Sequence, residues 1–256
     1  MNNMNNNSAV LVVNSDEFPM QVTTHGDLQP DDAAGLVLGR YTVTKRGLFR
    51  KKTASRPLIL PDKDVMRHIV VYGGGGYGVN IWLVDLAAQK MRSGWSAWFV
   101  DFFGDRRTAQ EFSAAAEDNA IPLSIMDSRL IRAADVSSML KVGRMAAYVH
   151  LDSMAACLPA KTSNVIEIIH QAISERLNSV TVDDLHPVLM VFNGFPQCNE
   201  TMPLITNMLA QCRSAKIGLV LRFHEYSADI KWQQAIDENT YTCVNFNSDM
   251  RDLSWK

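Results

Sequence analysis

The sequence His68-Ile-Val-Val-Tyr-Gly-Gly-Gly-Gly-Tyr-Gly-Val-Asn80 has the order of a buried strand, a glycine-rich turn and the start of a helix. A β-branched apolar run enters five glycines, and apolar residues then recur at helical spacing: Val79, Trp82, Leu83 and Leu86. Glycines let backbone N–H groups crowd around a phosphate, and a helix N-terminus adds partial positive charge. This stretch therefore predicts the centre of an α/β fold and raises the question of nucleotide binding.

Length and composition exclude several classes of protein. The chain has 256 residues, of which 47% are hydrophobic, and this suits one large domain or two small ones. Its net charge of −2 creates no overall field that attracts nucleic acid or an anionic membrane. No apolar run approaches the roughly 18 residues of a membrane-spanning helix. The asparagine-rich residues 1–8 lack the features of a signal peptide and are expected to form a disordered tail.

The four cysteines are scattered without the spacing of a metal site or a disulfide framework, which suits a reducing cytoplasm. From residue 68 onward, strand and helix patterns alternate. Near-continuous apolar strands are typical of a mainly parallel sheet, because both of its faces are covered by helices. The expected strands are 9–13, 36–43, 58–60, 68–73, 96–103, 122–126, 147–151, 187–193, 217–223 and 241–246. The expected helices are 78–92, 106–118, a short one within 128–144, 163–177 and 199–213.

A polar linker is expected from residue 14 to Asp32, and Gly39 suggests a bulge in the strand that follows it. Residues 45–56 carry six basic side chains and no acidic one. The favoured interpretation is the solvated tip of a hairpin, in which 58–60 pairs back. The alternative is a patch that contacts the phosphates of nucleic acid or acidic lipid. Its residues would be Lys45, Arg46, Arg50, Lys51 and Lys52.

The glycine stretch matches the P-loop pattern G-x-x-x-x-G-K-[ST] only in part. Gly73 and Gly78 fit, but Val79 stands where the lysine belongs and Asn80 where the hydroxyl residue belongs. In this pattern the lysine neutralises the β- and γ-phosphates and the hydroxyl holds Mg²⁺. Valine cannot replace the first group, and asparagine is a poor substitute for the second.

The same stretch also fits the dinucleotide-binding pattern G-x-G-x-x-G through Gly73, Gly75 and Gly78. Asp101, at the end of the next expected strand, has the position of a ribose-binding acid. Five glycines within six positions match such a pattern easily. A tight turn without any ligand therefore stays open as a third interpretation.

Three later segments follow the glycine stretch in a recognisable order. They are Asp101-Phe-Phe-Gly-Asp105, the run His186-Pro-Val-Leu-Met-Val-Phe-Asn-Gly-Phe-Pro196, and the run Leu204-Ile-Thr-Asn-Met-Leu-Ala-Gln-Cys-Arg-Ser-Ala-Lys-Ile-Gly-Leu-Val-Leu221. This order resembles the nucleotide-binding domain of the coupling ATPases of conjugation and type IV secretion, relatives of FtsK-type DNA translocases. The resemblance implies a three-layer, RecA-like P-loop domain over 67–256, preceded by a small N-terminal β appendage over 9–66.

The catalytic groups of that family are replaced in this sequence. Besides Val79 and Asn80, the two Walker B acids fall on Asn193 and Gly194, whereas Arg213 is retained. The lysine of the second-strand turn falls on Phe103, and the sensor glutamine on His224. Phosphoryl transfer needs charge neutralisation, a held Mg²⁺ and an oriented water. Losing one electrostatic donor typically costs a factor of about 10² or more, so losing the set should abolish ATP hydrolysis.

The resemblance thus implies a catalytically inactive pseudo-ATPase that acts as a protein-binding scaffold in a conjugative or type IV secretion apparatus. Its implied partners are other secretion or conjugation proteins, including an active paralogous ATPase. The implied location is the cytoplasm, including the periphery of the inner membrane. We expect no metal and no cofactor, and the degenerate phosphate loop consists of Gly73, Gly75, Gly76, Gly78, Val79 and Asn80.

Three alternatives stay open. The first is a non-hydrolysing sensor that binds ATP or ADP, and the second is an NAD-type enzyme that uses Gly73, Gly75, Gly78 and Asp101. The third is a nucleic-acid-binding module that uses the basic segment. Other conspicuous residues are expected to be structural: Asp101 and Asp105 as polar caps of the next helix, the histidines, and the core tryptophans Trp82, Trp95 and Trp98. Trp232 and Trp255 are interpreted as core or exposed residues, with anchoring of a partner as the alternative.

Overall fold

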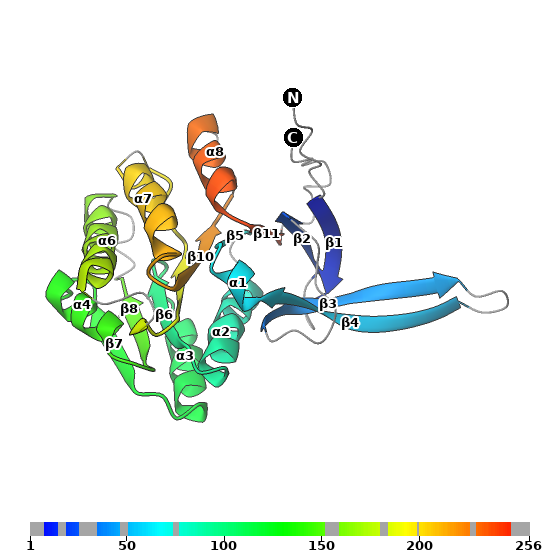
Figure 1. Ribbon diagram of the computed structural model, residues 1–256, viewed down its shortest axis with the longest axis horizontal. Helices are drawn as coiled ribbons and strands as arrows, with labels where there is room; N and C mark the ends of the chain where they lie inside the picture. Colours follow the sequence, from blue (N-terminus) through cyan, green and yellow to red (C-terminus); the bar gives the residue numbers. More distant parts are fainter. Residues whose placement is uncertain are drawn as a thin grey trace.

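The computed structural model describes residues 8–14, 19–25, 35–46, 51–73, 77–151, 159–179, 184–198, 200–225 and 229–246. These residues form an eleven-stranded sheet with helices on both faces (Figure 1). The prediction of a three-layer α/β fold with a mainly parallel sheet is confirmed, and the architecture is consistent with a RecA-like P-loop fold.

Seven neighbouring strands, from β11 to β7 in the sheet order, run parallel. The remaining four continue the sheet in antiparallel pairing. The order across the sheet is β4-β3-β1-β2-β11-β5-β10-β9-β6-β8-β7. The strands are β1 (Ser8–Asn14), β2 (Pro19–His25), β3 (Gly35–Arg46), β4 (Lys51–Pro61), β5 (Ile69–Tyr72), β6 (Ser96–Asp101), β7 (Leu123–Asp127), β8 (Ala146–His150), β9 (Val188–Asn193), β10 (Ile217–Phe223) and β11 (Thr242–Asn245).

Two hydrophobic cores separate the three layers. On one face the core includes Leu83 and Phe112, and on the other it includes Ile169, Met208 and Trp232. The connections from β5 through β6 to β7 cross the first face of the sheet, and those from β7 back to β11 cross the second. This change of face is what right-handed crossovers require when the direction along the sheet reverses. The helices are α1 (Asp62–Val65), α2 (Tyr77–Arg92) and α3 (Arg106–Asp118) on the first face. On the second face they are α4 (Ala133–Lys141), α6 (Pro159–Ser179), α7 (Met202–Cys212) and α8 (Ile230–Asn239).

The prediction of a polar linker up to Asp32 is wrong for Pro19–His25, because these residues form β2. Met20, Val22 and Thr24 are buried at alternate positions, and β2 pairs antiparallel with β11. Because β2 joins the parallel sheet to β1, the predicted N-terminal β segment continues the same sheet. Residues 1–7 of the expected tail lie outside the described residues, and Ser8 begins β1. The helix α8 occupies a stretch for which the sequence predicts no element.

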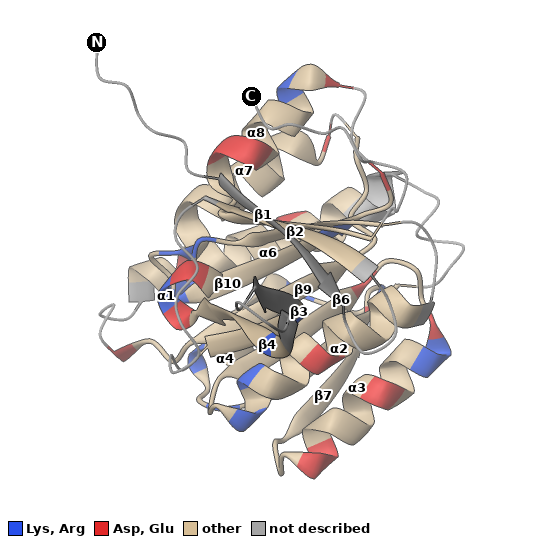
Figure 2. Ribbon diagram, turned by 90° about the vertical axis from the view of Figure 1, so that its right-hand side faces the viewer, with Lys and Arg blue, Asp and Glu red and all other residues tan. Residues whose placement is uncertain are grey.

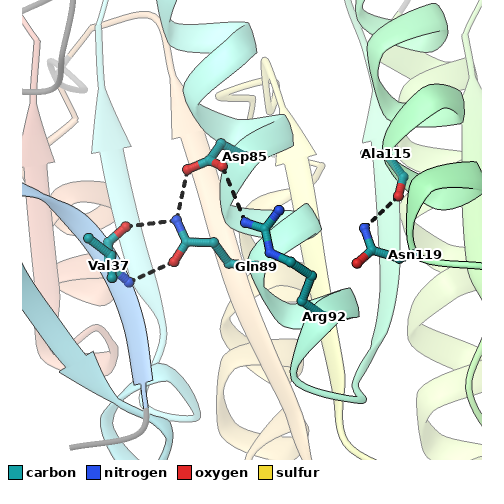
Figure 3. A network of polar contacts seen from close by, with 6 residues as sticks. All are labelled: Val37, Asp85, Gln89, Arg92, Ala115 and Asn119. Carbon is teal, nitrogen blue, oxygen red and sulfur yellow. Dashed lines mark hydrogen bonds and ion pairs between the residues drawn. The ribbon is translucent and has the colours of Figure 1, made fainter. Parts of the chain in front are cut away.

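The helix α2 holds the base of the β3–β4 hairpin. The predicted bulge is confirmed, since the register shifts between Val37 and Gly39. Gln89 of α2 accepts a hydrogen bond from Val37 N at 2.8 Å and donates one to Val37 O at 3.0 Å (Figure 3). Trp82 Nε1 donates to Leu38 O at 2.8 Å. These bonds satisfy backbone groups beside the bulge and attach the hairpin to the helix. Among the described helices, none is both long and apolar enough to cross a membrane.

Candidate functional site

Buried polar side chains gather where the parallel strands end. Carboxyl ends of parallel strands meet at one edge of a sheet, which is where open α/β sheets generally bind ligands. This edge carries a set of polar residues that are each at most 9% exposed. We call this set the edge network, and it consists of Asn80 (α2), Asp101 (β6), Tyr148 (β8), Asn193 (β9) and Arg222 (β10). The structure therefore brings together Asn80 and Asn193, two of the positions where the sequence resemblance implies replaced catalytic residues.

Asp101 is the anionic centre of the edge network and has no exposed surface. Its Oδ1 accepts hydrogen bonds from Asn193 Nδ2 at 2.9 Å and Phe103 N at 3.1 Å. Its Oδ2 accepts from Tyr148 OH at 2.6 Å and Asp105 N at 3.0 Å. Burial raises the pKa of Asp101, while these donors favour the ionised form. Both oxygens are thus engaged within the protein, which leaves Asp101 poorly placed to bind a ribose.

Arg222 places a cation between Asn80 and Asn193. Its guanidinium Nη1 donates to Asn193 Oδ1 at 2.7 Å and also to Asn80 Oδ1. Burial lowers the pKa of Arg222 to about 10, and Asp101 acts in the opposite direction, so Arg222 stays charged at neutral pH. In P-loop NTPases the hydroxyl of the loop and the Walker B acid hold Mg²⁺. At the two positions that the resemblance aligns with these groups, Arg222 of the chain itself bridges Asn80 and Asn193.

The amide nitrogen of Asn80 is also hydrogen-bonded within the protein. Its Nδ2 donates to Thr108 Oγ1 at 3.0 Å and, at 3.4 Å, to Asp105 Oδ2. Asp105 accepts from Arg107 N at 3.0 Å and caps α3, so the predicted capping role is confirmed for Asp105. Asp101 instead belongs to the edge network. Burial raises the pKa of Asp105, but the hydrogen bonds from Thr108, Arg107 N and Asn80 outweigh it and lower the pKa overall.

Gly194 has no room for a side chain. Its φ of +84° lies in the left-handed region, which favours glycine. A Cβ at this position would lie 2.5 Å from Cε2 of Phe103. The Phe103 ring is 41% exposed and covers Arg222, whose Cζ lies 5.1 Å from the ring centroid. An acid at position 194 would therefore require both a strained backbone and a displaced Phe103.

The described residues of the glycine stretch have structural reasons for their identity. A Cβ at Gly73 would lie 2.9 Å from Cβ of Phe246, whose N donates to Tyr72 O at 2.8 Å. Gly78 and Val79 are buried in the first turn of α2, where Val79 belongs to the core. Close packing against the end of β11 therefore accounts for Gly73. Gly75 and Gly76 lie outside the described residues.

The basic residues of the sequence analysis lie on the β3–β4 hairpin, outside the edge network. Lys45 pairs with Lys52 and Arg46 with Lys51 in the strand register, and Arg50 lies outside the described residues. The tryptophans predicted to be core residues, Trp82, Trp95 and Trp98, are buried, and so is Trp232. Trp255 and Cys157 lie outside the described part of the chain. Within that part, no group of three or more His, Cys, Asp or Glu residues could hold a metal ion.

Arg222, Tyr148 and Thr108 are missed by the sequence reasoning. For Arg222 a signal exists, because an arginine within the apolar strand Ile217–Phe223 is an unusual core residue. Tyr148 and Thr108 carry no such signal, since a tyrosine in a strand and a threonine in a first helical turn are ordinary.

No protein-family model and no curated protein matches this chain. Among solved structures, it is similar to the pCW3 conjugation coupling protein TcpA with ATPgS, at 12% identity and a TM-score of 0.41, over 91% of this chain and 75% of that one. It is similar to Thermomonospora curvata EccC (ATPases 2 and 3, with a signal sequence peptide) at 16% identity and 0.44, over 86% and 39%. For EssC from Geobacillus thermodenitrificans the values are 10% and 0.39, over 80% and 36%. The chain thus spans under half of the EccC and EssC chains, and its likeness to conjugation and secretion ATPases is one of fold.

Proposed function

We propose that this chain is a non-hydrolysing pseudo-ATPase that acts as a protein-binding scaffold in a conjugative or type IV secretion apparatus. One observation carries the proposal: the edge network joins Asn80, Arg222, Asn193 and Asp101 to one another instead of presenting them to a ligand. The order of sequence motifs suggests the setting. The proposed partners are other secretion or conjugation proteins, including an active paralogous ATPase, in the cytoplasm or at the periphery of the inner membrane.

The chemistry of ATP hydrolysis supports the loss of activity. Phosphoryl transfer needs a cation on the β- and γ-phosphates, two groups on Mg²⁺ and a residue that orients water. Val79 lies in the core, Gly194 has no side chain, and the charge of Arg222 is directed at Asn80 and Asn193. Each missing donor typically costs about 10²–10³ in rate. The combined loss leaves no useful hydrolysis.

The same contacts favour the scaffold over the NAD-type alternative. A ribose-binding acid must offer an oxygen to the ribose hydroxyl groups at the mouth of the site. Asp101 is fully buried and accepts from Tyr148, Asn193 and two backbone N–H groups. Moving it outward would leave Arg222 without its counter-charge.

Thermal unfolding in the presence of nucleotides tests the proposal. Ligand at one hundred times its Kd stabilises the folded state by about 2.7 kcal/mol, which is easily seen as a rise in Tm. We expect no rise with Mg·ATP, ADP or NAD(H), and no phosphate release above that of buffer. An Mg²⁺-dependent rise with ATP together with turnover would refute the proposal. A rise with ATP but no turnover would favour the nucleotide sensor, and a rise with NAD(H) the dinucleotide enzyme.

Two variants would locate any ligand that does bind. Asn80→Asp places a negative charge beside the glycine stretch and should abolish a phosphate-dependent rise in Tm. Lys141→Gln changes the net charge by the same amount at the C-terminal end of α4, on an exposed residue, and should leave the rise unchanged. A scaffold should also bind the active paralogous ATPase equally well with and without Mg·ATP in gel filtration.

A further inference from the structure

The β3–β4 hairpin extends beyond the sheet as a two-stranded ribbon. β3 meets β1 at Asn14↔Arg40, and beyond that pair the described residues of β3 pair with β4 alone. We call the register pairs from Tyr41↔Arg56 to Arg46↔Lys51 the arm. Six strand residues at about 3.4 Å each give it a reach of about 20 Å. Figure 1 shows it projecting away from all of the helices.

The far end of the arm concentrates positive charge. Its last two register pairs are Lys45↔Lys52 and Arg46↔Lys51, so residues of like charge stand directly opposite one another. Such pairs destabilise a sheet, and a two-stranded ribbon alone is only marginally stable. The arrangement works against the stability of the arm, which points to a role in binding.

The charge of the arm contrasts with that of the remaining chain. The segment 45–56 contains six of the 25 basic side chains and no acidic one, so its charge is +6. Because the net charge of the whole chain is −2, the remaining residues together carry −8. The helices α2 and α3 each carry residues of both signs of charge (Figure 2). The cations of the arm are therefore a local cluster at a projecting end, not part of a generally basic surface.

We propose that the arm binds an anionic lipid bilayer end-on through its last two register pairs. A ribbon that approaches tip first brings its last two register pairs, and hence four basic residues, to the headgroup phosphates. Clusters of four to eight Lys or Arg residues are typical of binding to acidic lipids. A ribbon lying in a nucleic-acid groove would instead present charge along its length. The next pairs toward the sheet, Thr44↔Thr53 and Val43↔Ala54, are uncharged.

The expected strength of this contact is moderate and depends on salt. One Lys or Arg near an anionic surface strengthens binding about fivefold, so four together contribute several hundredfold. Because the Debye length shrinks from about 10 Å at 0.1 M salt to about 3 Å at 1 M, binding should be lost at high salt. The arm lies apart from the edge network, so this inference can fail without affecting the proposed function, and the reverse also holds.

Co-sedimentation of the full chain with lipid vesicles tests the inference. The vesicles contain phosphatidylcholine alone or mixed with phosphatidylglycerol. The arm variant K45Q/R46Q/K51Q/K52Q is compared with a control, K63Q/R106Q/K141Q/K231Q, which removes the same charge from exposed residues elsewhere. The natural chain and the control should bind the vesicles that contain phosphatidylglycerol and should not bind those of phosphatidylcholine alone. The arm variant should bind the anionic vesicles at least a hundredfold more weakly than the natural chain does. The Tm of the arm variant should be equal or higher, because the like-charge pairs are gone.

Several results would overturn the inference. One is equal loss of binding in the arm variant and the control, which would indicate a general charge effect. Another is arm-dependent binding to a short DNA duplex that is tighter than binding to the vesicles, which would make nucleic acid the ligand. A lower Tm of the arm variant would assign the four cations to folding. Binding to phosphatidylcholine alone at the same strength would exclude an electrostatic contact.

Discussion

Acid should destabilise this protein through His68, the residue that opens the glycine stretch. His68 is 2% exposed. Its Nδ1 accepts from Leu219 N at 3.1 Å, so its Nε2 must carry the proton that is donated to Leu209 O at 2.9 Å. Burial is the main cause that lowers the pKa of His68 from 6.5 to about 4. The hydrogen bond to Leu209 O raises this pKa, and the charge of Arg213 lowers it further. The folded pKa lies below the unfolded one, so His68 contributes stability above pH 6.5 that is lost as pH falls toward 4.

The size of this effect follows from linkage. The gap between 6.5 and about 4 corresponds to about 3 kcal/mol in full, and to about 2 kcal/mol at pH 5. Urea unfolding is measured at pH 7.5 and pH 5 for the natural chain and for His68→Gln, which keeps a donor and an acceptor but does not titrate. The φ of +70° at His68 strains glutamine equally at both pH values, so this strain cancels. The natural chain should lose about 2 kcal/mol more than the variant between the two pH values, and equal losses would refute the reasoning.

Three further substitutions test the contacts described above, each through the free energy of unfolding in urea at pH 7.5. Gly194→Ala should cost about 1–3 kcal/mol because of the positive φ and because the new Cβ would clash with Phe103. Adding Phe103→Ala should recover part of this loss, and strictly additive losses would contradict the clash between Ala Cβ and the Phe103 ring. Arg222→Met should cost about 3–5 kcal/mol because buried Asp101 loses its counter-charge. Adding Asp101→Asn should then restore some stability, and no recovery would argue against the electrostatic pairing of Asp101 with Arg222. Gln89→Leu should cost about 1–3 kcal/mol because two backbone groups of β3 lose their partner, and an unchanged free energy would show that water replaces the amide.

The strands of the parallel sheet are predictable because they are buried on both faces. β9 and β10 are buried at every position, which favours the near-continuous apolar runs that the sequence shows before Asn193 and Arg222. β2 lacks this signal, since among its residues of described burial only Met20 and Val22 are both apolar and buried. Its pairing with the distant β11 supplies the rest of its stability. α8 buries little more than Trp232 and Ile236, so its helical period is too sparse to detect, although Asp229 caps it.

The candidate site is predictable only where a motif marks it. Asn80 and Asn193 stand out because they occupy positions that a known pattern reserves for other residues. Arg222 becomes meaningful only once β10 lies between β5 and β9, which pairs it with Val71 on one side and Asn193 on the other. Strand order depends on contacts between distant segments, and no local pattern encodes it. The role of Asp101 as the counter-charge of Arg222 is hidden for the same reason.

The helix α2 has two attachments, and together they constrain its length. Asn80 in its first turn belongs to the edge network, and Gln89 near its end holds the bulge of β3. These residues are nine positions apart, about 14 Å along the helix axis. Inserting or deleting one residue between them would rotate one attachment by about 100° relative to the other. We therefore expect α2 to tolerate no change in the number of residues that separates Asn80 from Gln89.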